Sequence, residues 1–172
     1  IMNKIRAELI NAFGGEFYEV IIGGAAFNKE VEAFFKKMGF PFTVGYGMTE
    51  CAPIITYDDW KEEKLYSCGK AAPNMQVRIA SSNPAEIPGE IQVKGANVFL
   101  GYYKNEEATN NVLYDNVYHT GDTAWRDEDG YFFYVSRVDD VIKSSGYRIG
   151  PFEIESVIME LPYVLECGVS AA

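Results

Sequence analysis

Residues that build metal centres and disulfide frameworks are scarce in this 172-residue sequence. Its three cysteines, Cys51, Cys68 and Cys167, lie far apart and form no Cys-x-x-Cys pair, and the chain has a single histidine. This spacing indicates neither a zinc site nor a disulfide framework. A reduced, cytoplasmic setting is the simpler interpretation of such cysteines.

Long apolar runs and an excess of positive charge are also missing. No stretch of about 18 apolar residues is present, so we expect no transmembrane segment, and we find no signal-peptide pattern. The 15 basic residues are outnumbered by 25 acidic ones, which gives a formal net charge of −10. This balance argues against nucleic acid as a partner, but a few local cations can still hold one small anionic ligand.

The sequence does contain enough apolar residues for a folded core. They make up 48% of the chain, and aromatic residues make up 15%, which argues against intrinsic disorder. The length fits one medium domain, or one domain with part of another. Because the chain begins inside a helical pattern and ends in an apolar run without a turn, we expect both ends to be cut from something longer.

The first part of the chain predicts alternating helices and strands. Apolar residues recur at helical spacing over residues 2–13, and the short apolar run at 17–27 resembles a buried strand. A second helix is expected between an N-cap at Asn28 and a final Gly39, and a strand over 40–46 follows it. The alternation predicts an α/β layer with parallel strands. The apolar face of the second helix is expected at Val31, Phe34, Phe35 and Met38.

Short strands replace this pattern after about residue 66. Turn residues separate apolar runs that favour strands, and these runs fall at 75–80, 90–94, 117–125 and 130–136. They predict a small antiparallel barrel or sheet, with a short helix at 105–113. From Arg137 onward the pattern predicts a hairpin with a Ser-Ser-Gly turn, a helix with Pro151 at its first position, and a strand over 164–169.

The stretch "GYGMTE", residues 45–50, follows directly on an apolar strand. Its glycines permit a tight turn and the close approach of a ligand, and Tyr46 between them offers a flat face to a planar ring. Thr49 supplies a hydroxyl for a phosphate oxygen, and Glu50 supplies an oxygen ligand that suits Mg²⁺. These residues fit a nucleotide with its metal, but taken alone they are a weak signal, and a plain strand-to-loop turn with solvated side chains is the alternative.

The stretch "YHTGD", residues 118–122, places an acid at the end of a strand. Asp122 can accept hydrogen bonds from the two hydroxyl groups of a ribose, which is the role of the acidic residue in dinucleotide folds. The same pentapeptide also fits an ordinary turn. His119 fits a structural imidazole better than a catalytic base.

A third stretch, "SRVDDVIKSSGYRIGPFEIE", covers residues 136–155. Arg137 can reach a phosphate or a ribose, and Lys143 can act as a point charge on a phosphate; surface ion pairs are the alternative for both. Asp139 falls where one pattern ends and another begins, so it is a candidate hinge. The Gly pair in "GGAA", residues 23–26, lacks the G-x-G-x-x-G fingerprint of dinucleotide sites. This excludes a NAD-linked oxidoreductase. Close helix–strand packing and contact with a ligand are the two interpretations left for these glycines.

Taken together and in this order, these stretches resemble the core motifs of the adenylate-forming superfamily, which includes acyl-CoA synthetases, luciferases and the adenylation domains of peptide synthetases. The resemblance covers essentially the whole chain and is strongest to acyl-CoA synthetases. It is carried by "GGAAFNKEVEAFF", "GYGMTE", "PGEIQVKGANVFLGYYKNEEAT", "YHTGD" and "RVDDVIKSSGYRIGPFEIE".

The resemblance implies the C-terminal part of the large domain of such an enzyme, followed by the start of its small α+β C-terminal domain. The α/β part would be residues 1–66, the barrel-like part 67–136, and the hinge with the start of the small domain 137–172. The implied activity joins a carboxylic acid to AMP at the expense of ATP, with Mg²⁺, and passes the acyl group to coenzyme A.

The resemblance also implies a role for each motif residue. Tyr46 would stack on adenine, Thr49 would touch the phosphates and Glu50 would bind Mg²⁺. Asp122 would hold the ribose hydroxyls, with Arg137 beside them.

The remaining implied roles lie at the two ends of the chain. Asp139 would be the hinge, and Lys143 would lie near the adenylate. Gly146 and Arg148 would belong to the loop that meets coenzyme A. The residues expected to line the acyl and adenine pocket are Gly24, Ala25 and Ala26.

Two parts of the family pattern are not in this sequence. The Ser/Thr/Gly-rich phosphate loop belongs upstream of residues 23–26, and the catalytic lysine of the C-terminal domain belongs beyond Ala172. We therefore expect this chain alone to form no acyl adenylate at a useful rate, which an assay of pyrophosphate release measures.

The resemblance allows one inference about the size of the acyl substrate, from Gly47. This residue occupies the position at which acetate-specific relatives have a tryptophan. The missing side chain predicts a chain longer than acetate. The first two thirds resemble the long-chain branch, whereas "YRIGPFEIE" resembles the acetyl and medium-chain branch. Another adenylate-forming ligase, such as a peptide-synthetase adenylation domain, and a non-catalytic nucleotide-binding remnant are the alternatives, and the oligomeric state stays open.

Overall fold

The computed structural model describes residues 1–138, 140, 142–144 and 147–170, and the elements below are those of this part of the chain. The helices are α1 (Met2–Ala12), α2 (Lys29–Met38), the 3-10 turn η1 (Thr49–Cys51), α3 (Glu106–Val112) and α4 (Pro151–Met159). The strands are β1 (Val20–Ile22), β2 (Phe42–Val44), β3 (Tyr46–Gly47), β4 (Ile54–Tyr57), β5 (Lys70–Ala71), β6 (Gln76–Ala80), β7 (Gly89–Lys94), β8 (Leu113–Tyr114), β9 (Val117–Arg126), β10 (Phe132–Arg137), β11 (Ile142–Ser144) and β12 (Tyr147–Ile149). None of these helices is long and apolar enough to cross a bilayer.

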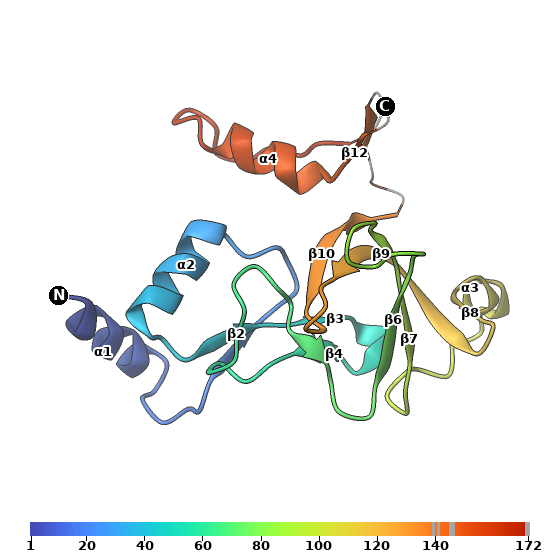
Figure 1. Ribbon diagram of the computed structural model, residues 1–172, viewed down its shortest axis with the longest axis horizontal. Helices are drawn as coiled ribbons and strands as arrows, with labels where there is room; N and C mark the ends of the chain where they lie inside the picture. The colour runs from blue at the N-terminus through green and yellow to red at the C-terminus, as the bar shows by residue number, and fades with distance from the viewer. Residues whose placement is uncertain (139, 141, 145–146, 171–172) are drawn as a thin grey trace.

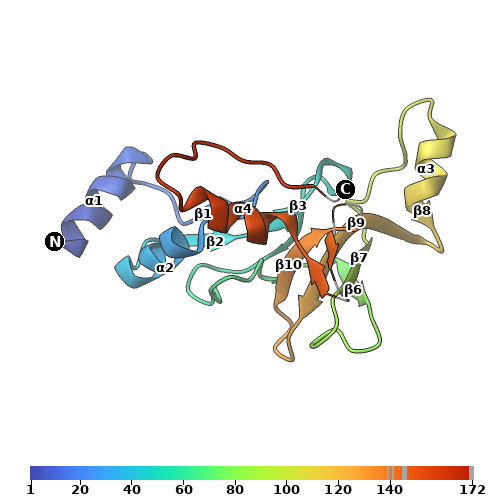
Figure 2. The same cartoon turned by 90° about the horizontal axis from the view of Figure 1, so that it is seen from above.

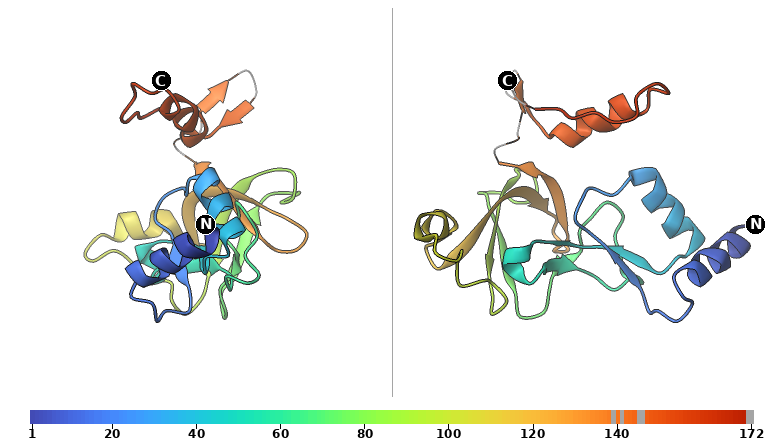
Figure 3. Two further views of the ribbon diagram at one scale, coloured as in Figure 1. Left: turned by 90° about the vertical axis from the view of Figure 1, so that its left-hand side faces the viewer. Right: turned by 180° about the vertical axis from the view of Figure 1, so that it is seen from behind.

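The elements are arranged in three groups (Figure 1). α1, α2, β1 and β2 lie at one end, and the antiparallel strands β6, β7, β9 and β10 lie at the other, with α3 and β8 beyond them. α4 and β12 form a third group beside the other two (Figure 3), and Gly150 between them packs against the Val135 carbonyl of β10. The predicted site residues Tyr46 and Asp122 lie on β3 and β9, so the candidate site lies where the first two groups meet.

The first group is the predicted parallel α/β unit. β1 and β2 pair in parallel, with Val20 opposite Phe42 and Ile22 opposite Val44. Phenylalanine rings fill its core and contact one another at centroid distances from 4.9 to 6.2 Å. The core rings belong to Phe17, Phe27, Phe35, Phe40 and Phe42, and Phe13, which is 57% exposed, contacts Phe17 and Phe40 from outside.

Capping residues set the ends of α2 where the sequence predicts them. The side chain of Asn28 accepts hydrogen bonds from two backbone N–H groups at the helix start, each at 3.0 Å. Gly39 ends the helix with a left-handed φ of 69°, a conformation that costs glycine least.

The expected apolar face of α2 is wrong in one respect. Val31 and Phe34 are each 39% exposed, whereas Glu32 is 3% exposed. The loop after β4 covers this side of the helix, and the backbone N–H of Tyr66 donates a hydrogen bond to the Glu32 carboxylate. Tertiary contact has therefore overridden the helical pattern.

The second group is an antiparallel sheet of order β10-β9-β7-β6, with β8 on β9. Every one of its four main strands lies in a run that the sequence assigns to a strand. Alternation is clear in β6, where Val77 and Ile79 are buried and their neighbours are exposed. Its core consists mostly of aliphatic side chains, among them Ile55, Ile91 and Val93.

A smaller sheet, β3-β4-β5, connects the two groups. Two backbone hydrogen bonds join Phe132 of β10 to Cys68 and Gly69, just before β5. The pairings of the described strands form open sheets, so the expected barrel is not closed by strand pairing. The sheet order ends at β6, and β3 and β5 contain only two residues each.

The two tryptophans lie in different groups. Trp125 on β9 stacks on Phe133 of β10, with ring centroids 3.8 Å apart and the planes 2° from parallel. The backbone N–H of Trp60 donates to the Glu19 carboxylate beside β1 at 2.9 Å, and its indole Nε1 is buried.

The C-terminal group contains the hairpin β11–β12 and α4, as predicted. β11 and β12 pair antiparallel, with Ile142 opposite Ile149, and the predicted Ser-Ser-Gly turn between them falls partly outside the described residues. Pro151 stands at the start of α4. The strand expected at 164–169 is wrong, because these residues pair with no strand in the described part of the chain and Leu165 lies in a bend.

Candidate functional site

Two glycine-containing loops meet at the carboxyl ends of the parallel strands. The loop at 23–26 follows β1 and the loop at 45–47 follows β2, and the backbone N–H of Gly45 donates to the Ile22 carbonyl at 2.8 Å. A Cβ atom on Gly23 would lie 3.0 Å from the Gly45 carbonyl oxygen, so the loops are packed backbone to backbone. Ligands of open α/β sheets bind at this edge.

The "GGAA" loop presents its small residues to solvent. Gly24, Ala25 and Ala26 are all exposed, and Gly24 has a φ of +92° with open space where a Cβ would be. The sequence left close packing or ligand contact for this loop, and the two glycines differ in this respect. Gly23 packs against the neighbouring loop, whereas Gly24 faces solvent.

Tyr46 begins β3 and connects the two main groups of elements. Its hydroxyl donates a hydrogen bond of 2.7 Å to Oδ2 of Asp122 on β9, and its ring centroid lies 6.1 Å from that of Tyr134 on β10. Burial, and then the Asp122 charge, raise the pKa of Tyr46. The Tyr46 hydroxyl is therefore a donor at neutral pH.

Asp122 is held from the other side by Arg137. The two residues face each other across β9 and β10, and Nη1 of Arg137 lies 3.4 Å from Oδ1 of Asp122. Asp122 is 6% exposed, whereas the Arg137 side chain is 46% exposed. Burial, and then the Asp122 charge, raise the pKa of Tyr134 to about 12. A buried carboxylate thus lies between two tyrosines and a guanidinium.

Thr49 and Glu50 belong to η1, which follows β3. Oε1 of Glu50 accepts a hydrogen bond of 2.8 Å from the Tyr102 hydroxyl, and its carbonyl accepts one of 2.8 Å from the backbone N–H of Phe99. Thr49 is exposed. Burial and the charges of Glu50 and Asp122 raise the pKa of Tyr118, so this buried tyrosine lies within the field of both carboxylates.

The donor set at Glu50 decides what metal chemistry fits. Among the described residues no group of three or more His, Cys, Asp or Glu side chains could hold a metal ion. Mg²⁺ is commonly held by one or two carboxylates together with the phosphates of its substrate. A single Glu50 therefore fits Mg²⁺ brought by a nucleotide, and not a metal caged by protein alone.

Gly47 has a structural reason to be glycine. A Cβ at this position would lie 2.1 Å from the carbonyl oxygen of Pro53, well inside contact distance, because β3 and β4 pair here with a register shift. Any side chain requires the Pro53 backbone to move. The glycine is explained by backbone packing and does not by itself indicate the length of an acyl chain.

The predicted residues of the C-terminal group are described only in part. Lys143 on β11 pairs with Arg148 on β12 in the backbone register. Their side chains, together with Asp139 and Gly146, lie outside the described residues. Of the residues predicted for the nucleotide site, the structure places Tyr46, Asp122 and Arg137 in mutual contact, with Asp122 between the other two.

Sequence reasoning missed two tyrosines of this region. Tyr102 bonds to Glu50, and Tyr134 lies beside Tyr46. Tyr134 alternates outward on a run already assigned to a strand, so a check of which strand face meets β3 could have found it; nothing local marks Tyr102. His119 is 8% exposed and stacks on Tyr114 at 3.6 Å, so its imidazole is a packed, buried ring and not a surface one.

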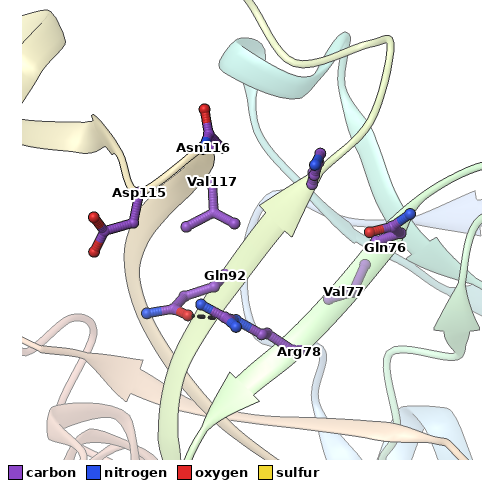
Figure 4. Close-up of a pocket in the computed structure, with 8 residues that line it drawn as sticks. Gln76, Val77, Arg78, Gln92, Asp115, Asn116 and Val117 are labelled. Atoms are coloured by element: carbon purple, nitrogen blue, oxygen red, sulfur yellow. Dashed lines mark hydrogen bonds between the residues drawn. The ribbon is translucent and has the colours of Figure 1, made fainter.

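A hollow of about 430 Å³ lies elsewhere, between β6, β7 and the β8–β9 turn (Figure 4). Arg78, Gln92, Lys94 and Asp115 are among its lining residues, and none of the predicted site residues is. It is therefore separate from the Tyr46–Asp122 region.

Residues 3–103 match the family described as AMP-binding enzyme. The chain belongs to this family. Family members include 2-succinylbenzoate–CoA ligase of Bacillus cytotoxicus, which is 36% identical over 98% of this chain and 37% of its own length. The mitochondrial acyl-coenzyme A synthetase ACSM3 of Rattus norvegicus is 40% identical over 87% of this chain and 27% of its own length.

The fold of this family member matches a solved acyl-CoA ligase. It superposes on o-succinylbenzoate coenzyme A synthetase (MenE) of Bacillus subtilis in complex with ATP and magnesium ion, with a TM-score of 0.80 and 30% identity. The match covers 96% of this chain and 37% of MenE. The chain thus spans about a third of the length of the relatives it matches, and the predicted family resemblance is confirmed.

Proposed function

We propose that the polypeptide containing this chain is an AMP-forming acyl-CoA ligase, with the nucleotide at the junction of β3, β9 and β10. The observation that carries the proposal is the contact of Tyr46 and Arg137 with one buried carboxylate, Asp122. These side chains come from segments far apart in the sequence, in a family whose member MenE was solved with ATP and magnesium ion.

The arrangement supplies groups suited to an adenosine. Asp122 would accept hydrogen bonds from the ribose hydroxyls, with Arg137 beside them and the Tyr46 ring against the adenine. The exposed residues Gly24 and Ala25 would border the adenine and the acyl group. The buried Asp122 is a strong acceptor because charge-assisted hydrogen bonds are about twice as strong as neutral ones.

Adenylation would take place between this surface and Glu50. A carboxylate oxygen attacks the α-phosphorus of ATP, a P–O bond forms, and the bond to pyrophosphate breaks. Thr49 would donate to a phosphate oxygen, and Lys143 would lie near the adenylate. Mg²⁺ on Glu50 would neutralise charge that builds on the phosphates, since positioning and electrostatic stabilisation supply most of such catalysis.

Thioester formation would complete the reaction. The coenzyme A thiol attacks the acyl carbonyl carbon, the C–S bond forms, and AMP leaves. We propose that Asp139 is the hinge about which the C-terminal residues move between the two steps, and that Gly146 and Arg148 meet coenzyme A. In this proposal residues 1–136 are the end of the large domain and residues 137–172 begin the small one.

For the acid we propose a medium- or long-chain carboxylate. The resemblance of the first two thirds of the chain to the long-chain branch supports it, whereas Gly47 gives no support because Pro53 occupies the space beside it. Turnover with acetate, octanoate, palmitate and 2-succinylbenzoate, compared at equal concentration, tests the choice. A preference for acetate or for 2-succinylbenzoate overturns the proposed acid and leaves the reaction class standing.

The proposed ribose site is tested with Asp122→Ala and the control Asp129→Ala, whose side chain is 72% exposed. In the polypeptide containing this chain, we expect Asp122→Ala to raise KM for ATP by about tenfold or more, as loss of a buried charged acceptor predicts. The control is expected to have no effect. Equal KM values for both variants contradict the proposed ribose site, and loading of a carrier protein instead of coenzyme A would favour a peptide-synthetase adenylation domain.

A further inference from the structure

The strand that carries Asp122 is irregular immediately before it. The pairing of β7 with β9 shifts register between Glu90 and Gln92, and Gly121 has a φ of +71°. Such bulges leave backbone groups without ladder partners and re-aim the side chains beside them. The direction of Asp122 therefore depends on what satisfies the backbone at this point.

Two side chains supply the missing partners. Oε1 of Glu90 accepts a hydrogen bond from the Gly121 backbone N–H at 3.2 Å. The hydroxyl of Thr120 donates to the Ile91 carbonyl at 2.9 Å and accepts from the Asp122 backbone N–H at 3.1 Å. Buried backbone donors are almost always paired in this way, so Glu90 replaces a ladder bond.

Glu90 is in turn held by His119. Oε2 of Glu90 lies 2.8 Å from Nδ1 of His119, and since a carboxylate only accepts, Nδ1 carries the hydrogen. The His119 ring stacks on Tyr114, and its buried Nε2 has no hydrogen-bond partner among the residues that the structure describes. Nδ1 also lies 3.3 Å from the Gln92 amide nitrogen, and because that nitrogen is itself a donor, the Nδ1 hydrogen is directed to Glu90.

The network extends to the hollow on the sheet. The Gln92 amide nitrogen lies 3.4 Å from Oε2 of Glu90, and its oxygen accepts from Nε of Arg78 at 2.7 Å, the dashed contact in Figure 4. The Glu90 carboxylate therefore has donors on both of its oxygens, which fixes its rotamer.

We propose that Glu90 and His119 are positioning residues of the nucleotide site. Glu90 holds the left-handed turn at Gly121 and thereby aims the Asp122 carboxylate, and His119 holds Glu90. This inference rests on the proposed function, in which Asp122 binds the ribose. Neither residue touches the ligand, so both act only through Asp122.

A double-mutant cycle separates positioning from general stability, since residues that act through one another are not additive. In the polypeptide containing this chain, KM for ATP and for 2′-deoxy-ATP is measured for Glu90→Ala, Asp122→Ala and the double variant. Glu90→Ala is expected to raise KM for ATP about tenfold with a smaller change in kcat, and to reduce the preference for ATP over 2′-deoxy-ATP. In the Asp122→Ala background it is expected to add less than about twofold.

Two conservative variants provide rescue and a milder perturbation. Glu90→Gln keeps an oxygen for the Gly121 N–H, and its amide can donate to His119 in the other tautomer, so KM is expected within about twofold of the parent. His119→Phe keeps a ring against Tyr114 but loses the donor, so an intermediate loss is expected. Glu86→Ala, at an exposed position before β7, is the control and is expected to behave as the parent.

The outcomes distinguish the two proposals. An Asp122→Ala variant with unchanged KM overturns the ribose site and this inference with it. A raised KM for Asp122→Ala together with an unchanged KM for Glu90→Ala, or with additive effects in the double variant, overturns the positioning role alone. If Glu90→Ala does not fold, the cycle is run with His119→Phe, and additivity there overturns the proposal.

Discussion

The parallel α/β group and the antiparallel sheet are stabilised in different ways. The first has two short paired strands and a core in which phenylalanine rings from α2, β2 and the adjoining loops pack with aliphatic side chains of α1 and β1. The second has long ladders and a core to which several strands each contribute aliphatic side chains. Seen from above, β3 lies between the two groups (Figure 2), and the Tyr46–Asp122 hydrogen bond connects them. The site therefore depends on both cores at once.

The difference between the two cores predicts which substitutions lower the stability of the chain most. A large ring in a small core leaves a large cavity when it is removed, whereas a single methyl group in the sheet removes little from a structure also held by backbone ladders. Removal of a whole ring from the first group and of one methylene group from the second should therefore have unequal effects on stability.

The largest effect is expected from Phe42→Ala. Phe42 is 1% exposed and contacts Phe35, with ring centroids 5.4 Å apart. Its loss should lower the free energy of unfolding by about 3–5 kcal/mol, measured by urea denaturation. Phe34→Ala, at an exposed position of the same group, is the control, and a loss for Phe42→Ala as small as that of the control would show that the rings do not hold this group.

Gly47→Ala tests the junction between the groups. The added Cβ would meet the Pro53 carbonyl, so the strand pair has to shift, and overpacking of this kind costs about 1–3 kcal/mol. Gly130→Ala is a partial control, because no atom lies within 4 Å of its Cβ position but its φ is +90°. Thermal denaturation of both variants measures the effect; equal losses would assign it to backbone strain, not to the contact with Pro53.

Ile91→Val examines the sheet. Ile91 is 2% exposed in the aliphatic core, and removal of one methylene group should cost about 0.5–1.5 kcal/mol, again by urea denaturation. The prediction concerns the ratio to Phe42→Ala. Losses of similar size for the two variants would contradict the expectation that the cost grows with the volume removed from a core.

The smallest effect is expected at Glu32 and depends on pH. Burial, and then the nearby charge of Glu63, raise the pKa of Glu32 above its ordinary value of 4.5. The folded chain therefore binds this proton more tightly than the unfolded chain, and stability is lost as pH rises through the raised pKa. Relative to the parent, Glu32→Gln should gain stability at pH 7 and none at pH 3.5.

The measurement for Glu32 is the difference in unfolding free energy between variant and parent across this pH range. Lys29 and Lys36 also face Glu32 and lower its pKa, so they are left intact. Glu30→Gln on the exposed side of the same helix is the control. A difference that stays constant with pH would argue against the raised pKa.

Local chemistry predicted much of this fold. The caps of α2 and the alternation in β6 are properties of neighbouring residues, and both helix and strand formed where expected. The exposed Val31 and the buried Glu32 were not predictable, because the loop that covers Glu32 arrives from residues far along the chain. The strand expected at 164–169 failed for a related reason: a strand requires a partner, and no described segment pairs with it.

The candidate site was predictable as a set of motifs and less so as a network. Tyr46, Asp122 and Arg137 were named from their own motifs, and the structure places them in contact. The link from Glu90 to Gly121 depends on a register shift between two strands, which no single strand reveals. At Gly47 the structure adds a packing requirement, the nearby Pro53 carbonyl, that the motif did not reveal, and the acyl length predicted from this glycine stays a prediction.

The placement of the two tryptophans gives each group its own optical reporter. Trp60 is attached to the α/β group through Glu19, and Trp125 is stacked within the sheet. Variants that keep only one indole would emit from one group at a time, so fluorescence could follow the loss of each core separately and show whether they melt together.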